Sequence, residues 1–297
     1  MTRRLAVFIG VVFSAVGWSA VGRSAEQAPA GLGRVYVTVV AADGSPVTDL
    51  TASEFGVREA GADMPIESVK PATDSMAIDM MTDRLGIDAT FTTAQTRAAL
   101  GVFVHTILDA SPDSRIAYRT IDGASVLEVK PTSSVVQLDT ALKKLFTNNR
   151  NPVLLEAIAD ACDDFRRAST QRRLIFALVA SYKADTSSVT GLTAANGLRE
   201  SRASLWAIEA NNVTGGVQSA KREGILLMGT RDSGGMLNVV NVGTALEGAA
   251  ERMAKLMLAQ YVITYVGAKQ PTAPSQVQVG TSRPNTKVLY PHWTFGK

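Results

Sequence analysis

The stretch "SMAIDMMTDRLG", residues 75–86, joins a continuous apolar run to an aspartate, and it decides how the rest of the chain is interpreted. A short apolar run that ends at polar residues is typical of a strand buried on both faces of a parallel sheet. Asp83 would then stand at the carboxyl end of that strand, where open α/β sheets form their binding crevices. The stretch therefore predicts an α/β fold and directs attention to Asp83 and Arg84.

The segments around this strand alternate between short apolar runs and longer stretches with helical spacing. This alternation indicates βαβ units around a largely parallel sheet. Thr92 and Gln95 form a capping-box pattern for a first helix, and Asn151 followed by Pro152 favours a second helix start. The Asp122-Gly123 pair predicts a tight turn, so one strand at the edge should run antiparallel. Strands are expected at "SMAIDMMT", "RIAYRTI", "SVLEVK", "RLIFALVA", "SLWAIE" and "MLNVV".

Both ends of the chain contain alternating apolar residues outside this pattern. Residues 34–70 alternate around an Asp43-Gly44 turn signal, which indicates β-structure. The tail contains "QVQVG" and "KVLYPHW", whose apolar residues need a strand partner, and the N-terminal strands offer open edges. We therefore expect residues 34–70 and 273–295 to share one small β-module.

The N-terminus has the layout of a secretory signal peptide. Arg3 and Arg4 precede an apolar run over residues 5–16, and small residues follow. The run is too short for the ~20 residues of a spanning helix, which argues against an uncleaved anchor, and no later stretch predicts a stable membrane span. Cleavage near Gly22 to Ala25 would place the mature protein outside the cell or in the periplasm. The expected units are a signal peptide (1–25), an N-terminal β-segment (30–72), a main domain (73–266) and a C-terminal β-segment (267–297).

Composition indicates a globular protein that is neither disordered nor a nucleic-acid binder. With 297 residues, 46% of them hydrophobic and 19% charged, the chain can bury a full core. The net charge is +3 and the basic residues are spread out, which does not favour nucleic-acid binding. The densest basic cluster, "RRASTQRR" at residues 166–173, is interpreted as a solvated loop. The single cysteine, Cys162, lies on an apolar helical stripe and is expected to be buried, without a disulfide partner.

Three segments resemble the VWFA-related family of acidobacterial proteins. They are the opening "VYVTVVAADGSPVTDLTASEFGVREAG", the later "PDSRIAYRTIDGASVLEVKP", and the closing "SGGMLNVVN" with "LEGAAERMAKLMLAQYVITYV". Their order and spacing over about residues 34–295 constitute the resemblance. It implies a Rossmann-like von Willebrand factor A-type three-layer sandwich, with a small β-module formed by the N- and C-terminal segments.

The resemblance also implies where a metal would bind. A-type domains that hold Mg2+ or Mn2+ use the pattern D-x-S-x-S after the first strand, a threonine before a later helix and an aspartate after the fourth strand. Here Asp83 remains, but Leu85 and Ile87 occupy both serine positions. Arg84 adds a cation that would lower the affinity for a divalent ion. Asp83 is therefore interpreted as a remnant that pairs with Arg84 or caps the following turn.

The two other ligand positions are changed as well. Asn151 and Pro152 stand where the threonine is expected, and Tyr182 stands at the aspartate position, with Asp185 shortly after it. The resemblance thus implies a degenerate metal-ion-dependent adhesion site without metal or other cofactor. A tyrosine in the vacated pocket either fills the space as packing or places its hydroxyl at a partner-binding rim. The expected rim consists of Asp83, Arg84, Asn151, Tyr182 and Asp185.

The resulting hypothesis is an exported, non-enzymatic A-type domain that binds a protein or a cell-envelope component without a metal. One alternative is a divergent A domain that retains weak Mg2+- or Mn2+-dependent ligand binding through Asp83 and Asp185. Another alternative is a serine hydrolase that uses Ser233, because "DSGG" at residues 232–235 also marks trypsin-like proteases. Those proteases require a histidine base, whereas His105 is expected in the middle of a helix.

Overall fold

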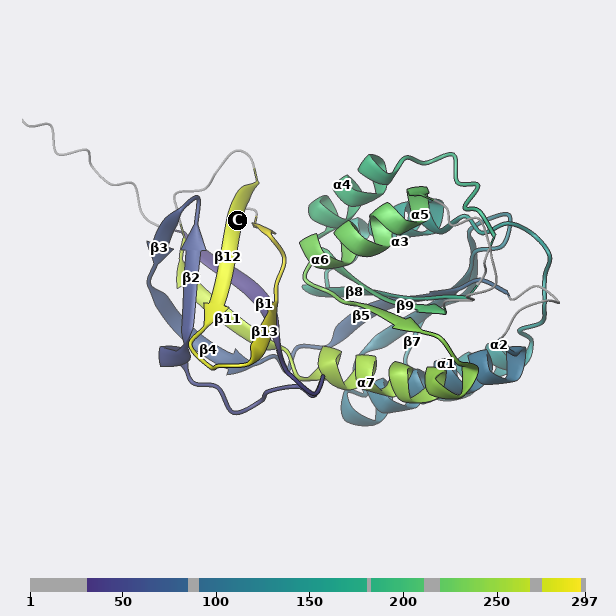
Figure 1. Ribbon diagram of the computed structural model, residues 1–297, viewed down its shortest axis with the longest axis horizontal. Coiled ribbons are helices and arrows are strands. Elements are labelled where there is room, and N and C mark those ends of the chain that lie inside the picture. Colours follow the sequence, from purple (N-terminus) through teal and green to yellow (C-terminus); the bar gives the residue numbers. More distant parts are fainter. Residues whose placement is uncertain (1–30, 85–90, 181–182, 211–219, 268–273, 295–297) are drawn as a thin grey trace, which may run out of the picture.

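The computed structural model describes residues 31–84, 91–180, 183–210, 220–267 and 274–294. These residues form two adjoining parts, a helix-flanked sheet and a separate β-module (Figure 1). The predicted fold class, a Rossmann-like three-layer sandwich with a β-module, is confirmed.

The central sheet has six strands in the order β10-β9-β8-β5-β6-β7. All neighbours are parallel except β7, which pairs antiparallel with β6 at the edge, as the Asp122-Gly123 turn predicts. Along β5, Ile78 and Met80 pack into the core on one face and Met81 into the core on the other. Burial on both faces explains the continuous apolar run. The strands are β5 (Met76–Thr82), β6 (Arg115–Thr120), β7 (Val126–Thr132), β8 (Arg172–Val179), β9 (Ala203–Ala210) and β10 (Leu237–Val240).

Helices cover both faces of this sheet (Figure 1). One layer consists of α1 (Thr93–Ala110), α2 (Val135–Lys143) and α7 (Leu246–Leu258), preceded by the short 3-10 helix η3 (Gly243–Ala245). The other layer consists of α3 (Leu154–Arg167), α4 (Gly191–Ser201), α5 (Ala220–Gly224), the π-helical turn η2 (Ile225–Gly229) and α6 (Thr230–Asp232). The predicted capping box of α1 is confirmed, since Thr92 Oγ1 accepts from Gln95 N at 3.2 Å and Gln95 Oε1 accepts from Thr92 N at 2.9 Å.

The β-module combines strands from both ends of the chain, as predicted. One sheet has the order β13-β1-β11-β4 and the other has the order β14-β12-β2-β3. Antiparallel pairing of β13 with β1 and of β12 with β2 joins the two chain ends. The strands are β1 (Leu32–Ala41), β2 (Phe55–Glu59), β3 (Ala62–Met64), β4 (Ile66–Pro71), β11 (Tyr261–Val266), β12 (Ser275–Thr281), β13 (Thr286–Leu289) and β14 (Trp293–Thr294), with the 3-10 helix η1 (Ala52–Glu54) before β2.

The strand β11 belongs to this module and not to the central sheet. The sequence-based division placed residues 73–266 in the main domain, but β11 pairs with β1 on one side and with β4 on the other. Its buried residues alternate along "YVITYV", the pattern of an antiparallel strand with one face in the core. The strands of the central sheet lack this alternation because helices cover both of their faces.

A buried arginine joins the two parts. Arg172, at the start of β8, is only 3% exposed. It donates from Nε to Gln260 Oε1 at 2.9 Å, from Nη1 to the Ala72 carbonyl at 3.0 Å, and from Nη2 to the Met257 carbonyl. Burial lowers its pKa to about 10. The expectation that residues 166–173 form a solvated loop is therefore wrong for Arg172. The chain passes between the two parts at Ala72 and at Gln260, and both segments supply hydrogen-bond acceptors for the guanidinium.

Two other expectations concern the cysteine and the membrane. Cys162 is fully buried in α3, and desolvation raises its pKa to about 12, as suits a packed side chain. In the described residues, no helix combines the length and the apolar character that a membrane span requires. The expected signal peptide, residues 1–25, lies outside the described residues.

Candidate functional site

The candidate site lies at the carboxyl ends of the parallel strands, on the side of the sheet that faces away from the β-module (Figure 1). Asp83 and Arg84 follow β5, Asp122 follows β6, and Asp185 lies in the segment after β8. Parallel pairing of β5 with both β6 and β8 brings these chain segments to one edge of the sheet. The edge is the place where open α/β sheets form binding crevices.

Asp83 is fully buried and holds two strands together at this edge. Its Oδ1 accepts a hydrogen bond from the Ala180 backbone nitrogen at 2.7 Å, just beyond the end of β8. The neighbouring Thr82 adds a second tie, since its hydroxyl donates to the Leu178 carbonyl at 2.9 Å. One oxygen of the Asp83 carboxylate therefore accepts a hydrogen bond from the backbone of the adjacent strand's end. The predicted cap on the following turn falls on residues 85–90, outside the described residues.

Arg84 pairs with Asp122, so the predicted pair with Asp83 is wrong. Its Nε lies 2.8 Å from Asp122 Oδ2, and its backbone nitrogen is 2.9 Å from both carboxylate oxygens. The Asp122 side chain is fully buried, and this desolvation raises its pKa while the hydrogen bonds from Arg84 oppose the rise. The two residues meet because they follow adjacent parallel strands. The sequence offered a signal in the Asp122-Gly123 pair, but it indicated only the turn.

Asp185 caps helix α3 from a distant loop. Its Oδ2 accepts from Leu154 N at 2.8 Å, and its Oδ1 accepts from Ser187 N at 2.9 Å. The helix begins at Leu154, so the start predicted from Asn151 and Pro152 is wrong. Asn151 is exposed. A cap supplied by a segment about thirty residues later has no local pattern, which is why sequence reasoning missed it.

Lys183 adds a cation to the same edge. Its ammonium group contacts the carbonyl and the side-chain oxygen of Asn149, and its charge acts to lower the pKa of Asp122. Tyr182, the remaining residue of the expected rim, lies outside the described residues. The edge thus presents Arg84 and Lys183 next to a buried aspartate.

The carboxylates at this edge do not form a ligand set for a divalent ion. Asp122 directs both oxygens to Arg84, Asp185 directs both to backbone N–H groups, and Asp83 uses Oδ1 for Ala180. Within the described part of the chain, no group of three or more histidine, cysteine, aspartate or glutamate residues is arranged to hold a metal. Divalent ions require several free oxygen ligands around one point. The described carboxylates therefore do not fit the metal that the resemblance implies.

A groove of about 620 Å³ opens beside Arg84, between the edge strands and α2. The Arg84 guanidinium lies 4.8 Å from the ring centre of Phe146, a side chain that is 60% exposed. Tyr118 lines the groove and is buried, and its hydroxyl has no hydrogen-bond partner among the described residues. Desolvation raises the pKa of Tyr118. The concave part of the edge thus lies on the side of β6, β7 and α2.

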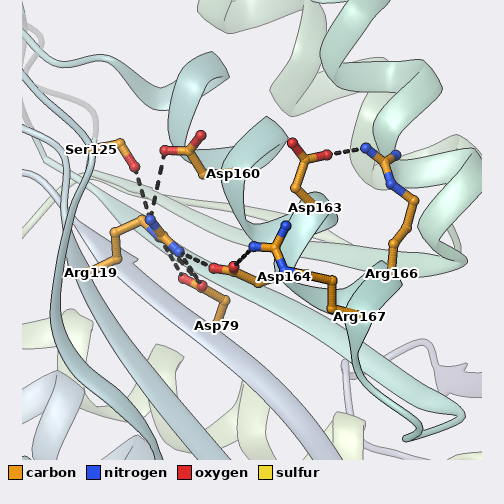
Figure 2. A network of polar contacts seen from close by, with 8 residues as sticks. All are labelled: Asp79, Arg119, Ser125, Asp160, Asp163, Asp164, Arg166 and Arg167. Atoms are coloured by element: carbon orange, nitrogen blue, oxygen red, sulfur yellow. Dashed lines mark hydrogen bonds and ion pairs between the residues drawn. The ribbon is translucent and has the colours of Figure 1, made fainter.

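A second polar cluster binds α3 to the sheet (Figure 2). Arg119 of β6 donates from Nη2 to Asp79 of β5 at 3.0 Å and to Asp164 of α3 at 2.9 Å, and from Nη1 to Ser125 at 3.0 Å. Asp160 lies 3.7 Å from the same guanidinium. Burial raises the pKa of Asp79 to about 6, although Arg119 opposes the shift. Because Arg119 and Asp79 are both almost fully buried, this cluster stabilises the fold and offers no open site.

Ser233 lies in a structural turn between α6 and β10. Its Oγ accepts from Leu205 N at 2.8 Å and donates to the Thr230 carbonyl at 3.4 Å. His292 lies nearby but pairs with Asp232 at 3.2 Å, and His105 pairs with Asp139 at 3.4 Å. In the described residues, no hydrogen bond joins Ser233 to a histidine. The arrangement does not supply the general base that a serine nucleophile needs.

Comparisons with known proteins agree with this architecture. No family model matches the sequence, and a search of curated proteins returns no match. The chain is similar to the solved structure of a von Willebrand factor type A protein from Catenulispora acidiphila, with a TM-score of 0.51 and 11% identity, over 91% of this chain and 64% of that one. It is also similar to the conserved hypothetical protein BatB from Bacteroides thetaiotaomicron, with a TM-score of 0.46 and 12% identity, over 61% and 98% of the chains. The first likeness shows the A-type fold.

Proposed function

We propose that this protein is an exported, non-enzymatic A-type domain that binds another protein or a cell-envelope component through the carboxyl edge of its sheet, without a metal. The single observation that supports the metal-free mode is the Arg84–Asp122 pair. A guanidinium fixed at this edge already supplies the positive charge that a divalent ion would bring. An acidic or polar group on a partner could therefore be recognised without a bound cation.

The surface beside this pair suits a protein partner. Phe146 and Val136 are 60% and 75% exposed, and the groove between them is lined by Lys130, Lys144 and Glu128. Exposed aromatic and aliphatic side chains surrounded by charged residues are typical of protein interfaces, in which a few apolar anchors dominate the affinity. We therefore place the contact surface on α2 and the segment after it, with Arg84 at its edge.

The proposed location rests on the sequence. The basic, apolar and small-residue segments of residues 1–25 follow the order of a secretory signal. Secretion or transfer to the periplasm would bring the domain into contact with envelope components. N-terminal sequencing of the protein isolated from the culture medium or the periplasm tests this part of the proposal. The expected first residue lies shortly after residues 22–25, and a chain that still begins at Met1 would contradict cleavage.

A binding experiment tests the interaction surface. The mature protein would be immobilised, and components captured from the envelope fraction of the source cells would be quantified against the variants Phe146→Ala and Val136→Ala. Both side chains are largely exposed, so each variant should fold normally yet lose the same captured component. Leu192→Ala is the matched control, because Leu192 is 71% exposed but lies on α4. Equal capture by wild type, both variants and the control would contradict the proposed surface.

Calorimetric titration with Mg2+ and Mn2+ tests the metal-free mode separately. The expected result is no saturable heat for either ion. Saturable binding tighter than about millimolar, the affinity of weak sites, would favour the alternative of a divergent metal-dependent A domain. The captured component should also be retained in the presence of a chelator.

A further inference from the structure

A pocket of about 420 Å³ lies at the opposite end of the sheet from the proposed contact surface. Its walls come from the starts of β8 and β9, from α4 and η2, and from the segment of the β-module that contains Pro291 and Trp293. The turn at Ser233 fastens this segment to the A-type domain, because the His292 nitrogen donates to the Asp232 carbonyl at 2.9 Å. The pocket is thus built by both parts of the molecule. Its volume is within the range of about 300–1,000 Å³ that is typical of small-molecule sites.

The lining has a strong excess of positive charge. Among the described residues that line the pocket, six are cationic and one, Asp232, is acidic. Asp232 is already paired with Arg231 and His292. A concave site lined by one sign of charge concentrates ligands of the opposite sign. The six cations are Arg34, Arg172, Arg173, Arg199, Arg202 and Lys221.

Arg199 differs in its partners from the pocket arginines Arg34, Arg172 and Arg173, the last of which donates to three backbone carbonyls. Arg34 pairs with Asp74, and Arg172 is hydrogen-bonded to backbone and side-chain acceptors. The Arg199 guanidinium lies 4.5 Å from the ring centre of Trp293. Its Nε is buried and has no hydrogen-bond partner in the part of the chain that the structure describes. The side chain as a whole is only partly buried and lines the cavity, so its guanidinium can donate hydrogen bonds to an anionic ligand there.

The remainder of the pocket is apolar. Leu198, Ile225, Met228 and Trp293 contribute hydrocarbon and aromatic surface around the arginine. The apolar lining continues towards the outside, since Met228 is 50% exposed. A fully hydrated inorganic anion would gain little from such walls, whereas an organic anion with an apolar body would bury that body against them.

We propose that this pocket binds an amphipathic organic anion, with its carboxylate held by Arg199 and its apolar body placed along η2 and α4. The proposal is independent of the partner-binding surface, which lies at the other end of the sheet. It assigns a ligand-binding role to the joint between the β-module and the A-type domain.

Titration of the mature protein with octanoate, followed by calorimetry, tests the proposal. We expect saturable binding with a Kd below about 1 mM, as for a small ligand with few heavy atoms. The neutral analogue 1-octanol has the same chain length, so its binding should be weaker by about tenfold, the effect of one charge-assisted hydrogen bond. No saturable binding of octanoate, or equal affinities for the acid and the alcohol, would overturn the proposal.

Arg199→Gln should weaken octanoate binding by about tenfold and leave the affinity for 1-octanol nearly unchanged. Arg166→Gln is the matched control, because Arg166 lies on α3, pairs with Asp163 and Glu200, and does not line the pocket. If Arg199→Gln does not fold, the variant Gly224→Leu tests whether octanoate binds in this pocket. Gly224 lines the pocket in a helical conformation, and an added Cβ would meet nothing within 4 Å. The leucine should block binding of both ligands while the melting temperature is retained, and unchanged binding of octanoate would contradict the proposed site.

Discussion

The two ends of the central sheet use their charged residues differently. At the carboxyl end, Asp83, Asp122 and Asp185 all accept hydrogen bonds from the backbone. At the amino end, six cationic residues line a pocket with one aspartate, and the Nε of Arg199 has no hydrogen-bond partner in the described residues. The metal-site motif of A-type domains directs attention to the carboxyl end, but the aspartates there stabilise the fold. The end without a motif contains Arg199, which is partly buried in the wall of the proposed ligand pocket.

The largest effect that distinguishes the ends should come from Arg172. Arg172→Met would leave Gln260 Oε1 and the carbonyls of Ala72 and Met257 without their donor inside the joint. Each buried acceptor left without a donor costs about 1–3 kcal/mol, so the loss of all three should exceed the effect of any other single substitution considered below. Urea unfolding should show this loss, with Arg167→Ala as the control, because Arg167 is 72% exposed and its pair contributes less than about 1 kcal/mol. Similar losses in the two variants would mean that the joint does not depend on Arg172.

At the carboxyl end, Arg84→Met should lower the free energy of unfolding by about 3 kcal/mol, because it leaves Asp122 buried without its counter-charge. The double variant Arg84→Met/Asp122→Asn removes the charge itself and should recover part of the loss. Chemical unfolding of wild type, both single variants and the double variant gives the coupling energy directly. A coupling near zero would mean that the pair does not hold the edge, and the comparison of the two ends would fail.

Between the two ends, Asp79 provides a pH-dependent measurement. Its pKa is raised from an ordinary 3.8 to about 6 by burial. Between these values the folded protein binds more protons than the unfolded chain, so this group's stabilisation is complete below about pH 4 and is lost as the pH rises through about 6. The shift corresponds to about 3 kcal/mol. The stability of wild type relative to Asp79→Asn should therefore fall by about that amount between pH 4 and pH 7.5, and a constant difference would contradict the shift.

Sequence reasoning reached the architecture but not the detailed chemistry of the site. Strands β5 to β10 are specified by local apolar runs and turns, so periodicity was sufficient to predict them. Arg84, Asp185 and Arg172 each bind residues that are far away in the sequence. These residues become neighbours only through the order of the strands in the fold, which no local sequence pattern specifies. The β-module was predictable because strand-like tails require a partner. The β-module also contains β11, which follows helix α7 directly and was therefore included in the main domain by its position alone.

The smallest predicted effect separates the two possible caps of α3. Asp185→Ala removes the acceptor for Leu154 N and should cost about 1 kcal/mol, the usual value of a helix cap. Asn151→Ala should change the stability by less than about 0.5 kcal/mol, because the side chain is exposed and the helix begins later. Hydrogen exchange of the first amides of α3 gives a second measure, since loss of the cap should increase exchange there before global unfolding. The opposite ranking of the two variants would restore Asn151 as the cap and leave the Asp185 carboxylate available at the edge of the sheet. In that case the weak metal-dependent alternative would regain one of its two proposed ligands.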